Sequence, residues 1–230
     1  MSIFAIGDLH LSFGVDKPMD IFKGWENYTQ LLYENWQQKV SDEDTVVICG
    51  DFSWAMTLDE LKPDMEFLCS LKGKKVLLKG NHDYWWQTQK KLDNFIKENN
   101  FSNIEFLFNN TIVRENYALC GTRGWLLENK SITENDRKII NRECGRLELS
   151  LKAGEQTALP IISFMHYPPV FDNYECEGIT ELLKKYNVKK CFYGHIHGNG
   201  SMYSVFGEYD GIDYKLVSAD NIKFSPVLVV

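Results

Sequence analysis

The sequence of 230 residues predicts a layered α/β sandwich with mixed β-sheets. Two observations predict this fold class. Short apolar runs alternate with segments of helical periodicity along most of the chain, which is the pattern of strand-helix-strand units. Strand-type runs near the end instead flank Asp210-Gly211, a preferred pair for two-residue hairpin turns, so part of the sheet is antiparallel. No internal repeat or Pro/Gly/Ser-rich linker interrupts the pattern, and we expect one domain over 1–230.

The first part of the chain predicts three strands and two helices. Residues 2–7 are an apolar strand, and residues 20–40 carry large apolar side chains at helical spacing. The β-branched run 45–49 is the second strand. Thr57-Leu58-Asp59-Glu60 has the form of a capping box that begins a helix. A third strand covers 75–78.

A helix is expected next at about 84–99, and three short strands follow it at 104–107, 111–114 and 117–121. Ser131-Ile132-Thr133-Glu134 offers another capping box, for a helix that runs to about 152.

The remaining elements begin with a strand at 161–165, a helix at 178–187 and a strand at 190–193. The runs 202–209 and 212–218 on either side of the turn, with a closing strand at 226–230, predict a β-meander.

Composition excludes several classes of protein. The net charge of -7, with no cluster of Lys or Arg, argues against a partner that is a long nucleic acid. No run approaches the length of a membrane-spanning helix, and the N-terminus lacks the pattern of a signal peptide. The six cysteines are widely spaced without a CxxC pair, which indicates free thiols in a reducing compartment. We therefore expect a cytoplasmic protein without a membrane partner.

Polar residues that can bind metals follow five of the predicted strands. These groups are Asp8 with His10, Gly50-Asp51, Gly80-Asn81-His82-Asp83, His166, and His195 with His197. Sites in open α/β sheets form beyond the carboxyl ends of the strands, so these residues are expected to meet in space. All five histidines of the chain fall in these groups, and chance alone would rarely place all of them there.

The spacing within the groups predicts metal binding. Asp8 and His10 lie two apart and would point to the same side of an extended backbone, as would His195 and His197. With Asp51, Asn81 and His166 they supply about four ligands to each of two ions if one carboxylate bridges. Imidazole and carboxylate donors suit transition metals, with Mn, Fe or Zn expected.

In the order and spacing of these five blocks, from residue 8 to residue 197, the sequence resembles the calcineurin-like metallophosphoesterase superfamily. The resemblance implies a four-layer α-β-β-α sandwich with two mixed β-sheets. It also implies hydrolysis of a phosphate ester by a hydroxide that bridges two metal ions.

The resemblance assigns a role to each residue. It implies that Asp8, His10, Asp51 and His197 hold one metal, and that Asp51, Asn81, His166 and His195 hold the other. His82 would face the substrate as a general acid or charge stabiliser, with Asp83 orienting it.

The sequence departs from the superfamily's pattern at two places. Trp54 stands where many members have Asp or Gly, and Tyr84-Trp85-Trp86 replaces the arginine that protein phosphatases place after the Asn-His block. The substrate-binding cation is therefore unassigned, and Arg123, between Thr122 and Gly124, is the candidate, with a surface arginine as the alternative. The segment from Phe13 to Gly24 is the expected substrate-facing lid.

Three functions are compatible with these features. The leading one is hydrolysis of a small phosphate ester, and a phosphodiesterase acting on nucleotide-type substrates is the alternative. Aromatic residues near the motifs could stack on a base or could simply belong to the core; they are Trp54, Trp85, Trp86, Trp125 and Tyr167. A scaffold without catalysis is a minor possibility, because all the motif residues are present. The sequence does not specify the oligomeric state.

Overall fold

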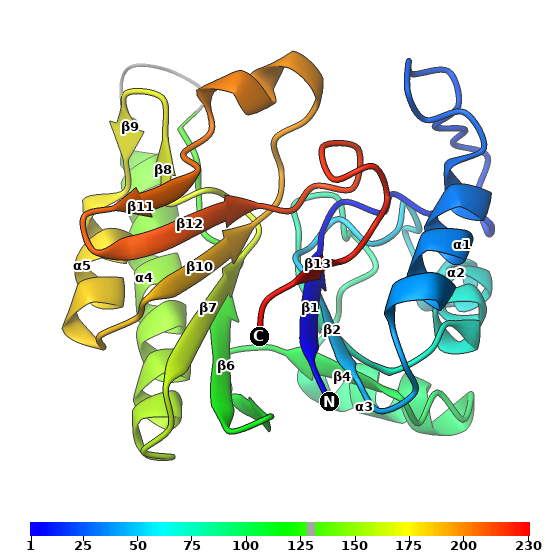
Figure 1. Ribbon diagram of the computed structural model, residues 1–230, viewed down its shortest axis with the longest axis horizontal. Helices are drawn as coiled ribbons and strands as arrows, with labels where there is room; N and C mark the ends of the chain where they lie inside the picture. The colour runs from blue at the N-terminus through cyan, green and yellow to red at the C-terminus, as the bar shows by residue number, and fades with distance from the viewer. Residues whose placement is uncertain (128–131) are drawn as a thin grey trace.

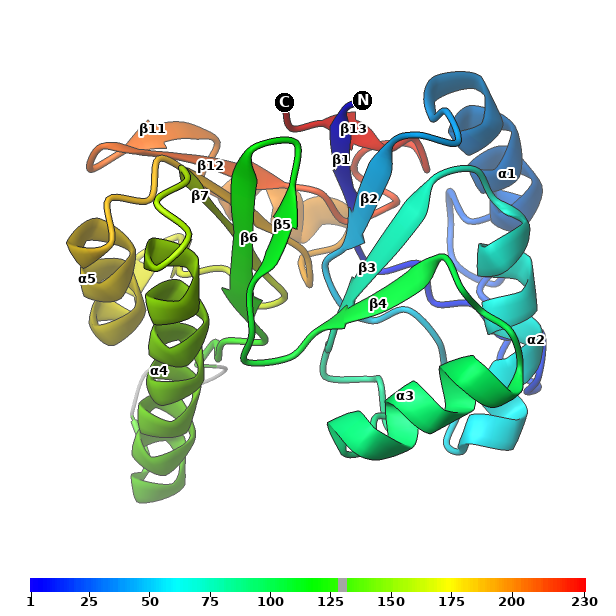
Figure 2. The same ribbon diagram turned by 90° about the horizontal axis from the view of Figure 1, so that it is seen from below.

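The structure, a computed structural model, describes residues 1–127 and 132–230. Two β-sheets pack face to face, and helices cover the outer side of each one, as Figure 1 shows from the side and Figure 2 from below. The result is the predicted four-layer α-β-β-α sandwich with two mixed sheets. The first and last strands lie side by side, which brings the two termini together (Figure 1).

The first sheet has the strand order β13-β1-β2-β3-β4. Strands β1 to β4 are parallel, and β13 is antiparallel to β1. Their bounds are β1 Ile3–Ile6, β2 Thr45–Ile48, β3 Lys74–Leu78, β4 Ile104–Leu107 and β13 Val227–Leu228. The helices on this side are α1 Tyr28–Lys39, α2 Leu58–Ser70 and α3 Gln89–Glu98 (Figure 1).

The second sheet has the order β11-β12-β10-β7-β6-β5, with β6, β7, β10 and β12 parallel. Its strands are β5 Ile112–Arg114, β6 Tyr117–Thr122, β7 Ile161–Met165, β10 Lys190–Tyr193, β11 Gly207–Tyr209 and β12 Ile212–Leu216. Helices α4 Glu134–Glu155 and α5 Glu177–Lys185 cover its outer face (Figure 2). A small hairpin, β8 Val170–Phe171 and β9 Tyr174–Glu175, and a 3-10 helix, η1 Gly198–Tyr203, complete the fold.

The four layers enclose three apolar cores because successive strand residues point to opposite faces. In β1, Ile3 and Ala5 belong to the core between the two sheets, whereas Phe4 and Ile6 face the helices of the first side. Strands β1, β2 and β7 are accordingly buried along their whole length, as parallel strands covered on both faces usually are.

The helix predicted from residue 20 begins only at Tyr28. Residues before it form turns, and Gly24 and Asn27 have left-handed φ angles of 91° and 53°, which end any helix there. The apolar spacing over 25–36 is real, but its first residue, Trp25, packs from a loop onto Tyr28, with ring centroids 5.1 Å apart.

The two predicted helix caps have different outcomes. Thr57 caps α2, where its side chain accepts a hydrogen bond from the backbone N–H of Glu60 (3.3 Å). Helix α4 begins after Thr133, which forms a capping box with Asp136. The predicted cap at Ser131 lies outside the described residues.

The predicted terminal meander is wrong in two respects. Strand β12 pairs antiparallel with β11 across Asp210-Gly211 as expected, but its other neighbour, β10, is parallel to it. Strand β13 then crosses to the first sheet. The predicted strand 202–209 is shortened, since η1 occupies 198–203, and the hairpin of β8 and β9 was not predicted.

Two further features concern the expected cellular environment. All six cysteines are free, four of them buried, in agreement with the predicted free thiols. In the described part of the chain, none of the helices has the length and apolar character needed to cross a membrane.

Candidate metal centre

The predicted polar residues meet where the two sheets present the carboxyl ends of their parallel strands. Asp8 and His10 follow β1, and Asp51 follows β2. His166 and His195 come from the other sheet, after β7 and β10. The side chains of these residues belong to two compact groups. Each group has donor atoms that could hold a metal ion.

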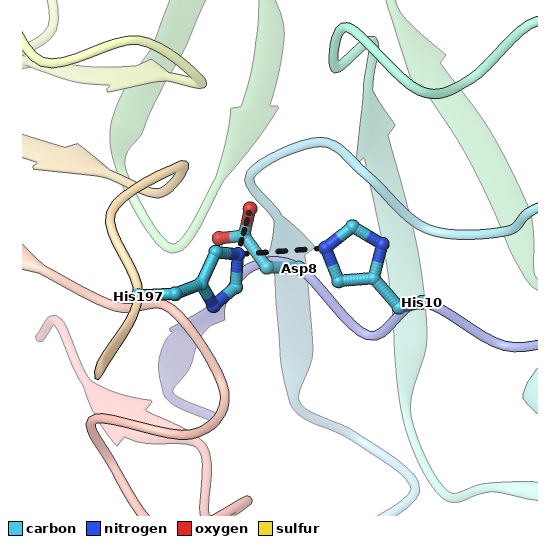
Figure 3. Close-up of side chains that lie close together, drawn as sticks. All are labelled: Asp8, His10 and His197. Carbon is cyan, nitrogen blue, oxygen red and sulfur yellow. Dashed lines mark hydrogen bonds and ion pairs between the residues drawn. The ribbon is translucent and has the colours of Figure 1, made fainter. Parts of the chain in front are cut away.

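The first group consists of Asp8, His10 and His197, whose candidate ligand atoms all lie within 4.8 Å of one another. The Nε2 atoms of the two histidines are 3.4 Å apart, and Nε2 of His197 lies 3.5 Å from Oδ1 of Asp8. Figure 3 shows both rings directing a nitrogen toward the same small space beside the carboxylate. All three side chains are thus placed to share one ion.

The second group consists of Asp51, His166 and His195, again within 4.8 Å. The amide oxygen of Asn81 lies 2.6 Å from Nε2 of His166, so Asn81 belongs to the same cluster.

Asp51 connects the two groups. Its Oδ2 atom lies 3.5 Å from Nε2 of His166 in the second group and 3.9 Å from Nε2 of His10 in the first. Its other oxygen, Oδ1, accepts a hydrogen bond from the backbone N–H of His82 (2.8 Å). One carboxylate oxygen therefore faces both groups while the other fixes its orientation.

The backbone at these residues corrects the predicted reason for their convergence. Asp8 and His10 are not in an extended strand: their φ angles are 57° and 46°, in the left-handed region. Asp51 (50°) and His195 (73°) share this conformation. Non-glycine residues rarely adopt it, and such strain concentrates at functional sites. Left-handed conformations at single residues, not strand alternation, bring the side chains together.

Two glycines of the motifs allow the turns to pack closely. A Cβ atom on Gly80 would collide with the backbone nitrogen and carboxylate of Asp51, and one on Gly194 would collide with the carboxylate of Asp8. Any larger residue at either position would displace a candidate ligand.

Partners outside the two groups orient the histidines. Nδ1 of His166 lies 3.0 Å from the carbonyl oxygen of Cys49, and Nδ1 of His197 lies 2.9 Å from Oδ1 of Asp220. Hydrogen bonds at Nδ1 leave Nε2 free to bind a metal. Asp220 was not predicted, because it lies in a loop after β12 and is part of no motif.

Burial and mutual charge set the protonation of the group. Burial lowers the pKa of His10 and of His195 to about 3, so both are neutral near pH 7. Burial also disfavours protonated His197, but its hydrogen bonds with Asp220 and Asp8 raise its pKa to about 10. Burial, followed by the charge of Asp8, raises the pKa of Asp51 to about 8. A cation between the carboxylates would favour their ionised forms and replace the proton of His197.

These observations fit a metal centre. The histidine nitrogens of the first group converge on one space, and among the described residues the buried carboxylates of Asp8 and Asp51 form ion pairs with histidines alone. Imidazole nitrogen with carboxylate and amide oxygen is a donor set for transition metals.

His82 stands beside the centre but belongs to neither group. It lines a cavity of about 520 Å³ that also exposes His10, Asp51, His195 and His197. Its ring lies 4.5 Å from that of Trp54, centroid to centroid, and burial lowers its pKa. Among the residues that the structure describes, no partner hydrogen-bonds with its Nδ1. A molecule bound in this cavity could therefore contact His82.

Asp83 does not orient His82 as expected. Its buried carboxylate accepts hydrogen bonds from four backbone N–H groups and one indole, those of Asp51, Phe52, Ser53, Gly80 and Trp85. The carboxylate therefore holds the Asp51 turn against the turn that carries Asn81 and His82. Asp83 is a positioning residue for two motifs.

Arg123 is also placed differently from the prediction. It lines a separate cavity of about 20 Å³, and its Nη2 atom lies 3.7 Å from Oε1 of the buried Glu143. Arg146 binds the same carboxylate oxygen at 2.7 Å. Arg123 thus serves an ion-pair cluster on α4, which corrects its assignment as the substrate-binding cation. Lys23 lines the large cavity instead.

The aromatic residues near the motifs divide between core and cavity. Trp85 and Trp86 belong to the core under the first sheet, with 0% and 7% of their surface exposed. Trp54 lines the large cavity, as do Met19 and Phe22 from the predicted lid segment.

Comparisons with known proteins agree with this geometry. A model of the calcineurin-like phosphoesterase family matches residues 1–199. Among solved structures, a protein of unknown function from Aquifex aeolicus has a TM-score of 0.53 and 17% identity. The match covers 99% of this chain and 95% of that protein. The phosphopantetheinyl hydrolase of Mycobacterium tuberculosis has a TM-score of 0.53 and 14% identity, and the match covers 100% of this chain and 95% of the hydrolase. At these identities the likeness shows the fold alone. No protein among those with curated descriptions matches the sequence.

Proposed function

Because the chain belongs to the calcineurin-like phosphoesterase family, we propose that it is a hydrolase that cleaves a small phosphate ester with the aid of two metal ions. The observation that carries the proposal is the position of Asp51, whose Oδ2 faces a donor group on either side. A pair of sites about 3.5–4 Å apart is the arrangement that two-metal hydrolases use.

In this proposal Asp8, His10, Asp51 and His197 hold one ion, and Asp51, Asn81, His166 and His195 hold the other. When bound, such ions lower the pKa of a water to about 7 and stabilise charge on the attacking and leaving oxygens. Mn, Fe and Zn suit the donors best.

The charge of the centre explains how an acidic chain attracts an anionic substrate. The ligand set has only two carboxylates, those of Asp8 and Asp51, because Asn81 is neutral. Two divalent ions would therefore leave a surplus of roughly two positive charges. Lys23 adds a further cation at the cavity.

His82 is the proposed catalytic residue. It lines the cavity next to Asp51, and its lowered pKa keeps the ring neutral near pH 7 unless a negative charge approaches. A phosphate ester bound there would favour the protonated ring, which can then donate a proton to the leaving oxygen.

The second candidate is a phosphodiesterase that acts on nucleotide-type substrates. Trp54 favours it, because an aromatic ring beside the reacting centre can contact a base. Its ring, however, is already stacked on His10, with the planes 21° apart and the centroids separated by 4.8 Å.

The direct test is hydrolysis by the purified protein with Mn²⁺ added. We expect release of phosphate from one or more phosphomonoesters in a panel that also holds diesters and cyclic nucleotides. The Asp51→Asn variant is the inactive control. Cleavage of the diesters alone would favour the second candidate, and no cleavage by protein with bound Mn²⁺ would favour a scaffold.

The wider setting is proposed on the same basis. The two sheets share one core between them, which supports a single domain over 1–230. Six free thiols support a reducing compartment such as the cytoplasm.

A further inference from the structure

One side of the cavity at the metal centre is apolar. Met19 and Trp25, both from the segment before α1, line it together with Trp54 and Phe22. The lining also includes His10, Asp51, His82, His195 and His197. A single cavity thus joins the proposed reacting centre to a hydrophobic wall.

The wall is fixed against the first donor group. The indole N–H of Trp54 donates to the sulfur of Met19 (3.3 Å), while its ring stacks on His10. Trp25 is 5% exposed, and its ring lies 5.9 Å from that of His197 and 5.0 Å from that of Phe224. The wall is therefore preformed.

Phe22 differs from the rest of the wall because 53% of its surface is exposed. Its backbone N–H donates to the carbonyl of Met19 (3.0 Å), and its carbonyl accepts from the N–H of Trp25 (3.1 Å). The side chain is a large apolar group at a cavity, with much of its surface still available to a ligand.

Two lysines lie near the wall, while Asp51 and Asp220 also line the cavity. Lys23 lines the cavity, and Nζ of Lys17 lies 4.4 Å from the ring centroid of Trp54. These cations and the metal centre suit a phosphate group, whereas the wall cannot stabilise one. The cavity is complementary to a molecule with an anionic end and an apolar end.

We propose that the alcohol part of the substrate carries an apolar group, which binds against Phe22, Trp25 and Trp54 while the phosphate lies at the metal centre. This inference rests on the proposed function. A volume of about 520 Å³ lies within the range of small-molecule sites and accommodates a compact aromatic or branched aliphatic group.

The test is a series of n-alkyl phosphates from ethyl to octyl, because these leaving groups have nearly equal acidity. Each methylene that is buried against the wall should raise kcat/KM by about threefold to fourfold until the cavity is filled. Phe22→Ala should reduce this dependence on chain length, so that the loss in kcat/KM is larger for octyl phosphate than for ethyl phosphate. Ile21→Ala is the matched control, since Ile21 is an exposed apolar neighbour (73%) that is not among the described cavity-lining residues.

A second measurement does not depend on turnover. The affinities of n-alkylphosphonates, which cannot be hydrolysed, should increase along the same series with Mn²⁺ bound. Hydrolysis of all the esters with equal kcat/KM would overturn the apolar site and leave the phosphoesterase proposal intact. An equal chain-length dependence in wild type and Phe22→Ala would also overturn it. If no ester is cleaved, the proposed function fails, and equal phosphonate affinities would then reject the apolar site as well.

Discussion

Oδ2 of Asp51 lies 3.9 Å from Nε2 of His10, although the two residues follow different strands and belong to different donor groups. The same oxygen is 3.5 Å from Nε2 of His166, which follows a strand of the other sheet. The proposed two-metal function depends on this position, since a carboxylate that faces both groups can bridge two ions.

His82→Ala should retain bound metal and lose turnover by roughly 10²–10⁴-fold, the usual contribution of a general acid. The reason is that His82 lines the cavity but lies outside both donor groups. Metal content and kcat, measured on the same preparation, check the prediction. Loss of an ion together with the activity would instead make His82 a ligand.

Asp83→Ala should destabilise the protein by at least about 3 kcal/mol, because buried N–H groups lose their acceptor and each one costs about 1–3 kcal/mol. Urea denaturation measures the change in the free energy of unfolding. The exposed Asp59→Ala is the control on a helix of the same side. A change below about 1 kcal/mol would show that Asp83 does not hold the two turns together.

Asp220→Ala should weaken one ion and spare the other. Its carboxylate accepts from Nδ1 of His197, and loss of such a partner typically lowers metal affinity by about 10–100-fold. Stepwise Mn²⁺ titration by calorimetry separates the two binding events. Equal weakening of both events would argue that Asp220 acts on the fold and not on His197.

Asp64 should make stability depend on pH. Burial raises its pKa from 3.8 to about 6, so the folded protein holds this proton more tightly than the unfolded chain. The stabilisation is complete below about pH 4 and is lost as the pH rises through 6. Asp64→Asn, which retains a carbonyl acceptor for the N–H of Phe13 (2.8 Å in the wild type), should remove this dependence. Identical pH profiles of the free energy of unfolding for the two proteins would contradict the shift.

The sequence was sufficient to predict the strands and the convergence of the polar residues that follow them, because apolar runs and sheet topology obey general rules. The sequence predicted that Asp8 and His10 meet, but it attributed this to an extended backbone. Asp8 and His10 share a side through left-handed backbone conformations, which a residue pattern does not reveal.

Long-range contacts explain the remaining differences. Asp83 and Asp220 act through hydrogen bonds to residues 30 or 23 positions away, and neither pairing has a spacing signal. The position of Arg123 before Gly124 suggested a loop near a ligand, but the buried Glu143 on α4 determines where its guanidinium lies. Phe22 falls within the segment predicted as a lid, but the fold is needed to identify it as the exposed aromatic residue at the cavity.

Titration of the metal-free protein with Mn²⁺, followed by electron paramagnetic resonance, tests whether Asp51 bridges two ions. We expect two bound ions per chain with the signal of a spin-coupled pair, and loss of both binding events in Asp51→Asn. A single bound ion, two uncoupled ions, or an Asp51→Asn variant that loses only one of them would contradict this bridging role.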